Sequence, residues 1–318
     1  MSKKYTSIGG QALIEGIMMK SPEKTAMAVR KPDKTIEIIY LEDKNIKFKI
    51  AKLPIIRGVV NFVKSMVQGY KALMISADKS GFTDLEEEKT EKNEKKQGIF
   101  VAVILAIGSV LGVALSIGLF MLLPRLFVGF LESAFKTDFS KFVRSGIEQF
   151  LKLAIFVGYV WAVSFMKDIK RVFMYHGAEH KTIFCYEAGL PLTVENARKQ
   201  TRFHPRCGTS FMILMILISI IISTIVQMIF PQVYDMALVW VLIKILLIPL
   251  TCGVGYEVLK ACGKYDNIIT KIISAPGLWL QRLTTKEPED DMLEIAIAAI
   301  KACEPEVPDV ERNCTEEE

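Results

Sequence analysis

The chain has 318 residues, of which 51% are hydrophobic and 24% are charged, and its formal net charge is +5. A mean hydropathy of +0.32 is high for a soluble protein with this many charges, so the apolar residues must be segregated into blocks. The modest positive charge gives no reason to expect nucleic-acid binding, because Lys and Arg also act as membrane-topology signals. The six cysteines form no C-x-x-C pair and the N-terminus is polar, so neither a disulfide framework nor a cleavable signal is expected.

The first 52 residues are predicted to form a small β-rich module. Residues 25–30 and 35–40 have the composition of strands, and the turn between them contains Pro32 and Asp33. Glycines that precede these strands in the sequence indicate further tight turns.

Residues 53–77 are predicted to form an amphipathic interfacial helix. Its polar residues recur at steps of three and four, which places them in one stripe along a helix. The stripe consists of Arg57, Asn61, Lys64, Gln68 and Lys71. Such a helix either lies in the membrane interface with its basic residues toward the headgroups, or packs on the protein's own spans with the stripe facing water. Residues 78–98 follow as a charged linker.

Four apolar segments are predicted to span a membrane. They are residues 99–123, 151–166, 211–230 and 236–259. The first and third have no charged residue and are long enough to cross a bilayer core. Lys152 lies at a span end and can reach the interface, whereas Lys244 is nearer mid-span and needs a partner or a polar cavity.

The predicted fold class is therefore an all-α polytopic membrane protein with about four transmembrane helices and a small N-terminal β-rich cytoplasmic module. The expected regions are 1–52 for the module, 53–77 for the interfacial helix, 78–98 for the linker, 99–274 for the membrane region with a loop at 167–210, and 275–318 for a C-terminal cytoplasmic helix and acidic tail. The C-terminal helix is expected at 288–302, where proline and acids begin an amphipathic pattern.

Positive charge in the loops orients the spans. Lys and Arg number 19 before the first span, 8 in the 167–210 loop and 7 in the C-terminal tail, against 4 in residues 124–149 and none in residues 231–235. Because cytoplasmic loops hold the excess of Lys and Arg, both termini and the 167–210 loop are predicted to be cytoplasmic.

All three histidines fall within one window of 29 residues. His176 and His180 are four residues apart, so they would lie on one face of a helix. Glu179 beside them completes the string H-x-x-E-H, an inverted zinc-protease motif in which the carboxylate is a general base. His204 and Cys207 add a second pair with the spacing of metal ligands. The sequence therefore predicts a divalent metal site, zinc by ligand type, on which the three histidines converge.

The ligand set decides what such a site can do. If the three histidines bind the metal alone, one position stays open for water, and Glu179 can act as the catalytic base. If Cys207 is a fourth ligand, the site is closed and structural. Without a metal, the histidines would make ordinary polar contacts, and Glu179 would pair with a neighbouring basic side chain such as Lys181.

Basic residues near the second pair suit an anionic substrate. Arg198 and Arg202 share a helix face and Arg206 follows, so these three arginines are the predicted substrate-binding residues for a phosphate or carboxylate. The positive-inside bias explains them nearly as well.

Two carboxylates are further site candidates. Glu187 lies two helical turns after His180 and could join it as a ligand. Glu257, at the cytoplasmic end of the last span, would either face the site or neutralise Lys260.

Four strings of the sequence resemble the YqhQ-like family, a bacterial membrane-protein family defined by a domain of unknown function. They are GGQALIEGIMM at 9–19, YHGAEHK at 175–181, HPRCGTSF at 204–211 and PGLWLQ at 276–281. The resemblance extends over residues 5–302 and implies a protein of the bacterial plasma membrane. Members are labelled predicted metal-dependent enzymes, a label that rests on the same histidines and implies no particular substrate.

The residues and the resemblance together favour a zinc-dependent membrane enzyme, a hydrolase that acts at the cytoplasmic face. The alternative is a non-enzymatic scaffold or assembly factor with a structural His/Cys metal site. A transporter is less favoured, because four helices without paired broken segments offer little of a pathway. Membrane lipids, and in the alternative other membrane proteins, are the expected partners. The sequence does not predict an oligomeric state.

Overall fold

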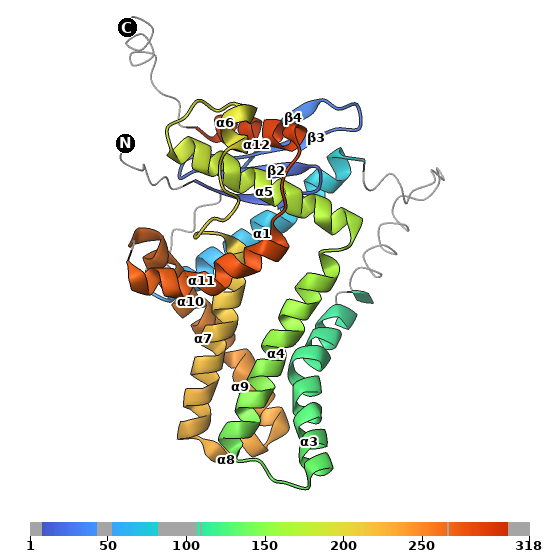
Figure 1. Ribbon diagram of the computed structural model, residues 1–318, viewed down its shortest axis with the longest axis vertical. Helices are drawn as coiled ribbons and strands as arrows, with labels where there is room; N and C mark the ends of the chain where they lie inside the picture. Colours follow the sequence, from blue (N-terminus) through green and yellow to red (C-terminus); the bar gives the residue numbers. More distant parts are fainter. Residues whose placement is uncertain (1–7, 43–52, 82–106, 109, 266, 305–318) are drawn as a thin grey trace, which may run out of the picture.

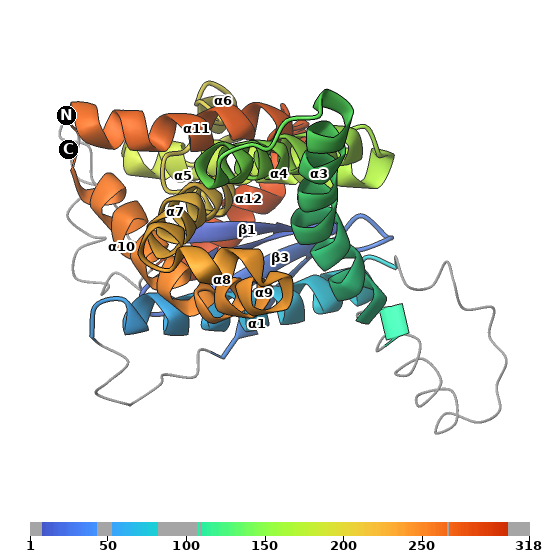
Figure 2. The ribbon, with the colours of Figure 1, turned by 90° about the horizontal axis from the view of Figure 1, so that it is seen from below.

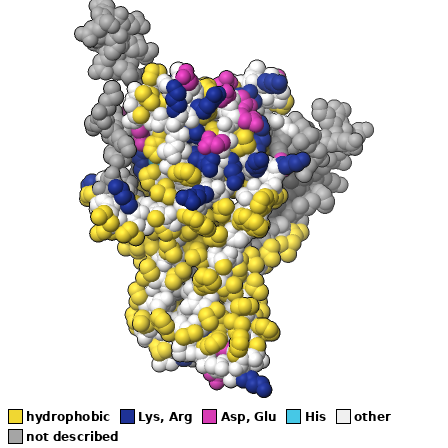
Figure 3. Space-filling view, viewed as in Figure 1, with side chains coloured by type: hydrophobic (Ala, Val, Ile, Leu, Met, Phe, Trp, Pro, Cys, Tyr) yellow, Lys and Arg dark blue, Asp and Glu magenta, His cyan; other side chains and the backbone are white. Residues whose placement is uncertain are grey.

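A four-stranded antiparallel sheet lies at one end of the molecule, and a bundle of long apolar helices extends away from it (Figure 1). The computed structural model of the chain describes residues 8–42, 53–81, 107, 108, 110–265 and 267–304. Charged side chains gather at the end that holds the sheet, whereas the visible face of the bundle is mostly apolar (Figure 3). This architecture confirms the predicted class of a helical membrane protein with a small N-terminal sheet.

The sheet is built from consecutive hairpins. Its strands, in spatial order, are β1 (Gly9–Leu13), β2 (Gly16–Lys20), β3 (Thr25–Arg30) and β4 (Ile36–Leu41). The predicted strands at 25–30 and 35–40 correspond to β3 and β4 and pair in register from Arg30–Ile36 to Thr25–Leu41. The glycine-rich string before them forms a second hairpin, which turns at Glu15 with a φ of 50°.

Helices cover both faces of the sheet (Figure 2). Helix α1 (Ile56–Lys79) lies on one face, and α5 (Lys167–Glu187) and α12 (Asp290–Cys303) lie on the other. Because side chains alternate along a strand, Ile17 and Met19 of β2 point to the α5 and α12 side while Met18 points to the α1 side. We call β1–β4, α1, α5, α12 and the short helix α6 (Val194–Arg198) the sheet unit.

Helix α1 confirms the predicted amphipathic helix but not the direction of its polar stripe. Arg57 pairs with Glu257, Asn61 donates to the Tyr256 hydroxyl, and Gln68 contacts β2 and β3. Arg57 and Gln68 are therefore turned toward the protein, whereas Asn61 stays exposed, and several apolar residues of the helix are exposed as well. The large apolar residues of α1 that are exposed are Ile56, Val63, Met66, Val67, Tyr70 and Met74. The helix packs on the span that contains α10, which was one of the two alternatives. The expectation that the stripe faces water or headgroups is wrong for Arg57 and Gln68, because residues of α10 and of the sheet bind these two side chains.

Within the described part of the chain, four helices are long and apolar enough to cross a membrane, which makes the chain compatible with a multi-pass membrane protein. The spans are Val110–Phe135 with η2 (Gly118–Leu122) and α3 (Leu123–Phe135), Lys141–Val163 (α4), Gly208–Ile229 (α7), and Leu238–Cys262 with α9 (Ala237–Leu246) and α10 (Ile248–Lys264). A short helix, α8 (Pro231–Asp235), joins the last two. We call these helices the spanning bundle.

The first two spans extend further along the chain than predicted. The first reaches Phe135 rather than residue 123, and the second begins at Lys141 rather than residue 151. The supposed loop at 124–149 therefore shrinks to residues 136–140. Charged residues made this region look extramembrane, but Glu132 and Arg144 form an ion pair of 3.1 Å between the two helices. A charge that is paired inside a bundle does not end a span.

The C-terminal part returns the chain from the bundle to the sheet. Helix α11 (Ile268–Thr284) packs along α7 and crosses the region boundary predicted at residue 275. The predicted helix at 288–302 is confirmed as α12. The predicted charged linker lies almost entirely outside the described residues, and the acidic tail lies outside them as well.

The segment between α11 and α12 crosses α5 closely. The Lys286 N–H donates to the Phe173 carbonyl at 2.9 Å. A Cβ at Gly177 would lie 2.0 Å from the Lys286 carbonyl oxygen. The glycine inside the histidine motif is therefore required by this crossing.

Candidate metal centre

Helix α5 presents the two histidines of the motif side by side, as their spacing predicted. The ring centroids of His176 and His180 are 4.4 Å apart. The rings lie where α5 meets the upper ends of α7 and α11, and only 9% of His176 and 1% of His180 is exposed.

Backbone carbonyls determine which nitrogen of each ring is available. His176 Nδ1 lies 2.9 Å from the Thr284 carbonyl oxygen, and His180 Nδ1 lies 2.5 Å from the Arg202 carbonyl oxygen. A carbonyl oxygen can only accept, so both Nδ1 atoms carry the proton. In the neutral rings each Nε2 atom then has a free lone pair. Metal-binding histidines are commonly oriented by this kind of outer hydrogen bond.

Cys207 supplies the third ligand atom. It is the N-cap residue of α7, and its Sγ lies 3.1 Å from His176 Nε2. One nitrogen of His176, one nitrogen of His180 and this sulfur all lie within 4.8 Å of one another. Among the described residues, the Nε2 atom of His180 is buried without a hydrogen-bond partner.

His204 lies beside this group and is not a member of it, as far as the described residues show. Its ring centroid is 5.4 Å from that of His180 and 4.8 Å from that of Phe184. Burial, and then electrostatic interaction with His180 and Arg206, lower the pKa of His204 to about 2. A neutral imidazole is therefore held next to the ligand group.

Gln281 of α11 holds the backbone of the His204 segment. Its side-chain oxygen accepts from the His204 N–H at 2.8 Å, and its nitrogen donates to the His204 carbonyl at 2.7 Å and to the Ser210 hydroxyl at 2.8 Å. Gln281 is fully buried. The loop that carries His204 and Cys207 is thereby fixed to the helix that orients His176.

Glu179 faces the same space from the sheet side of α5. Burial raises the pKa of its carboxyl group to about 7, although His176 and the N–H of Gly10 partly offset this effect. A Cβ at Gly10 would lie 2.8 Å from the Glu179 Cγ, so β1 can approach this carboxylate only with a glycine. The close approach explains one glycine of the N-terminal string.

A cavity of about 550 Å³ connects these residues to the surface. Its polar lining comprises Glu179, His180, His204, Arg206, Cys207, Tyr256, Lys260 and Lys264. The lining of the cavity thus combines three cationic side chains with one carboxylate and candidate metal ligands. The cavity lies where β1 and α5 of the sheet unit meet the upper ends of α7 and α10.

Only one of the three predicted substrate-binding arginines lines this cavity. Arg206 does, and Glu187 accepts a hydrogen bond from its guanidinium group, so Glu187 positions an arginine instead of serving as a ligand. Arg198 pairs with Asp290, and Arg202 pairs with Glu287 at 3.1 Å.

Glu257 does not face the site, whereas the other alternative, an interaction with the charge of Lys260, is present beside a stronger one with Arg57. Arg57 of α1 binds its carboxylate through two nitrogens, and Glu257 does not line the cavity. Lys264 lines the cavity and was not predicted, and Lys260 was predicted only as a partner of Glu257. Their spacing of four on a helix was the available signal.

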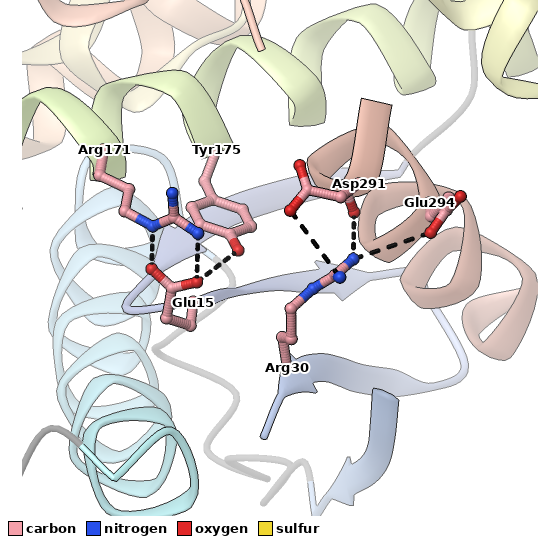
Figure 4. Close-up of polar contacts among 6 residues, drawn as sticks. All are labelled: Glu15, Arg30, Arg171, Tyr175, Asp291 and Glu294. Atoms are coloured by element: carbon pink, nitrogen blue, oxygen red, sulfur yellow. Dashed lines mark hydrogen bonds and ion pairs between the residues drawn. The ribbon is translucent and has the colours of Figure 1, made fainter. Parts of the chain in front are cut away.

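A second polar cluster fixes α5 over the sheet (Figure 4). Arg171 binds both carboxylate oxygens of Glu15, and the Tyr175 hydroxyl donates to the same carboxylate at 3.0 Å. Burial tends to raise the pKa of Glu15, but the hydrogen bonds and charge of Arg171 outweigh it and the net shift is downward. Arg30 similarly joins β3 to Asp291 and Glu294 of α12.

The donor set fits a zinc ion. Two imidazole nitrogens and one thiolate are borderline and soft ligands that zinc prefers, and both imidazoles have the tautomer that ligation requires. If these three residues were its only protein ligands, a zinc ion would keep one coordination position for water, as zinc does in catalytic sites.

Comparisons with known proteins describe relatives without giving an activity. The model of the family described as a protein of unknown function, DUF1385, matches residues 53–306, which include His176, His180 and Cys207. Over 293 residues the chain is 38% identical to the uncharacterized protein YqhQ of Bacillus subtilis (strain 168), with 91% of this chain and 89% of that protein covered. No solved structure matches the chain.

Proposed function

This chain belongs to the DUF1385 family of proteins of unknown function, and we propose that it is a metal-dependent hydrolase whose zinc ligands are His176, His180 and Cys207. One observation carries the proposal. The Nε2 atom of His180 is buried without a partner among the described residues, and one nitrogen of His180, one nitrogen of His176 and the Cys207 Sγ lie within 4.8 Å of one another, close enough for a single ion. In this ligand set Cys207 takes the place of His204, which was predicted as the third histidine ligand.

The roles of the residues follow from their places around the cavity. A zinc ion held there would supply Lewis-acid activation of water and of a substrate oxygen. Glu179 accepts the proton of the attacking water and returns it to the leaving group. Thr284 and Arg202 hold the imidazoles through their carbonyl groups, and Gln281 holds the loop that carries the cysteine.

The substrate class follows from charge and position. Arg206, Lys260 and Lys264 place three cations around the cavity, and α10, which carries both lysines, is the upper part of a spanning helix. An anionic headgroup at the membrane surface, with a phosphate or carboxylate for these cations to bind, matches both features.

Metal content and function of variants of Glu179 and His180 test the proposal. Purified His180→Ala should lose stoichiometric zinc in elemental mass spectrometry, whereas Glu179→Gln should keep it, because the amide is nearly isosteric and the ligands are intact. Glu179→Gln should nevertheless fail to complement a deletion strain. Glu195→Gln, at an exposed carboxylate of α6, is the matched control and should complement. A stable Glu179→Gln variant that complements would rule out the hydrolase.

The second candidate function is a scaffold or assembly factor with a closed metal site. It is favoured by the neutral ring of His204, whose centroid lies 5.4 Å from that of His180 and which could become a fourth ligand after a small movement. In that case His204→Gln should lower zinc content and protein abundance, and Glu179→Gln should complement. In the open, catalytic site, His204→Gln should retain zinc.

We further propose that the protein lies in the bacterial plasma membrane with both termini and the metal centre on the cytoplasmic side. The excess of Lys and Arg in the chain ends and in residues 167–210 supports this orientation. A reporter inserted after Asp138, in the short loop at the far end of the bundle, should be outside, and one after Lys199 should be inside. Cytoplasmic labelling of position 138 would reverse the assignment.

A further inference from the structure

Charged residues inside the spanning bundle surround a second cavity, remote from the metal centre. It has a volume of about 280 Å³ and lies between the first span, α4 and α9. Its polar lining consists of Arg125, Glu148, Trp240 and Lys244. Arg125 is ten residues from the end of its span at Phe135, which places it roughly 15 Å inside the bundle at 1.5 Å per residue.

Positive charge is in excess around this cavity. Glu148 accepts a hydrogen bond from the Tyr234 hydroxyl at 3.0 Å. Lys244 lies 4.9 Å from the centroid of the Trp240 ring and interacts directly with Lys152 of α4. Two ammonium groups cannot hydrogen-bond to each other, so one amine of the Lys152–Lys244 pair is neutral, and Arg125 together with the one charged lysine gives two cations for one carboxylate. Such groups within a membrane are costly and usually mark a functional site.

The polar side chains of the lining also include more hydrogen-bond donors than acceptors. The indole nitrogen of Trp240 is buried and has no partner among the described residues, and the whole side chain is only 2% exposed. An indole nitrogen can only donate. With Arg125 and Lys244 as further donors, the group that would complete this site is an acceptor with negative charge.

The cavity opens sideways, toward the lipid. Ile117 and Leu122 line it and are 40% and 54% exposed. Between them lies the π-helical segment η2, and a Cβ at its first residue, Gly118, would meet nothing within 4 Å. Single π-helical turns are frequent at functional sites. Only 6% of the most apolar stretch of this span is buried, so its outer side is available to a partner within the bilayer.

We propose that this cavity receives a carboxylate carried by the membrane-spanning helix of another protein. The charge and donor excess call for an anion. The depth of Arg125 favours a side chain on a spanning helix over a lipid headgroup, which lies at the surface. The cavity volume of about 280 Å³ is several times the volume of about 30 Å³ that one water molecule occupies in the liquid, so an acidic side chain fits.

Energy transfer from Trp240 to a synthetic helix tests the proposal. The full-length Trp161→Phe, Trp279→Phe protein, in which Trp240 is the only tryptophan, is reconstituted in phosphatidylcholine vesicles. The probe is an oligoleucine helix of about 20 residues with one glutamate at mid-span and a dansyl acceptor beside it. Transfer should be saturable for the glutamate peptide and at least about tenfold weaker for the glutamine peptide. Equal binding of the two peptides, or no binding, overturns the proposal.

Two variants and a change of lipid locate the contact. Gly118→Leu fills the lateral mouth and should abolish transfer, whereas Gly112→Leu, at a site that is also open but outside the cavity, should not. Lys244→Met should weaken binding of the glutamate peptide but leave binding of the glutamine peptide unchanged. This variant keeps the proposal testable if the Gly118→Leu protein does not fold. If phosphatidylglycerol in the vesicles displaces the peptide, the site binds lipid anions and the proposal is wrong.

Discussion

The sheet unit and the spanning bundle are packed in opposite ways. In the sheet unit, residues of α12 such as Leu293 and Ile295 are completely buried between α5 and the sheet. In the bundle, between 6% and 28% of each span's most apolar stretch is buried. The two regions therefore require different surroundings. The sheet unit is stabilised by the burial of apolar side chains away from water, whereas lipid solvates the exposed apolar side chains of the spanning bundle.

The candidate metal centre lies where these two regions meet. His176 and His180 belong to the sheet unit, Cys207 begins a spanning helix, and Thr284 ends the helix that packs along it. A ligand set drawn from both regions depends on their relative placement, so a bound ion would join the sheet unit to the membrane.

The largest predicted change in stability is for a glycine-to-alanine substitution in the sheet unit, compared with the same substitution in the spanning bundle. Gly177→Ala brings a methyl group against the Lys286 carbonyl and should destabilise the sheet unit by about 3 kcal/mol or more. Gly158→Ala faces open space on α4 and should be neutral or stabilise by up to about 1 kcal/mol. Thermal unfolding in detergent, followed by circular dichroism, measures both. A tolerated alanine at 177 would mean that the 285–289 segment does not cross α5 as described.

A pair of apolar truncations should give the next effect. Leu293→Ala leaves a hole in a water-excluded core and should cost about 3 kcal/mol of unfolding free energy. Ile221→Ala, on a bundle side chain that is 59% exposed, should change stability by less than about 0.5 kcal/mol. Equal losses would show that the exposed face of α7 is covered by protein.

Glu15→Gln should have a smaller, pH-dependent effect. It removes the charge that Arg171 binds and should destabilise the sheet unit by about 1 to 2 kcal/mol at neutral pH. Because the folded pKa of Glu15 is lowered, this contribution is present above its unfolded pKa, about 4.3, and is lost as the pH falls through the folded value. Denaturant titrations of wild type and variant should therefore converge in acid. A constant difference would contradict the linkage.

The smallest effect is expected for a polar pair within the bundle. Gln149 donates to the Ser223 hydroxyl at 3.1 Å, between α4 and α7. Gln149→Leu should cost only about 0.6 kcal/mol, the average for such pairs in membranes. Unfolding in mixed detergent micelles measures it, with Ser223→Ala as the partner variant. A loss of several kcal/mol would identify this pair as a main link between the two spans.

The sequence-based predictions succeeded where a local period sufficed. The step of four between His176 and His180 put both rings on one helix face, and the apolar period at 288–302 located α12. Predictions that needed a partner failed. Arg57 forms an ion pair with Glu257, and Arg198 forms one with Asp290. Glu132 and Arg144 pair between two spanning helices, in a region that was predicted to be a loop.

By itself, the sequence determined the membrane class, the hairpin of β3 and β4 and the face that carries the two histidines. These depend on spacing and on apolar length, which are local properties of the chain. Only the tertiary structure decided that Cys207, more closely than His204, approaches the pair, and that carbonyl oxygens orient both imidazoles. Which atoms converge depends on how α5, α7 and α11 cross, and residues 176, 207 and 284 carry no local signal of that crossing.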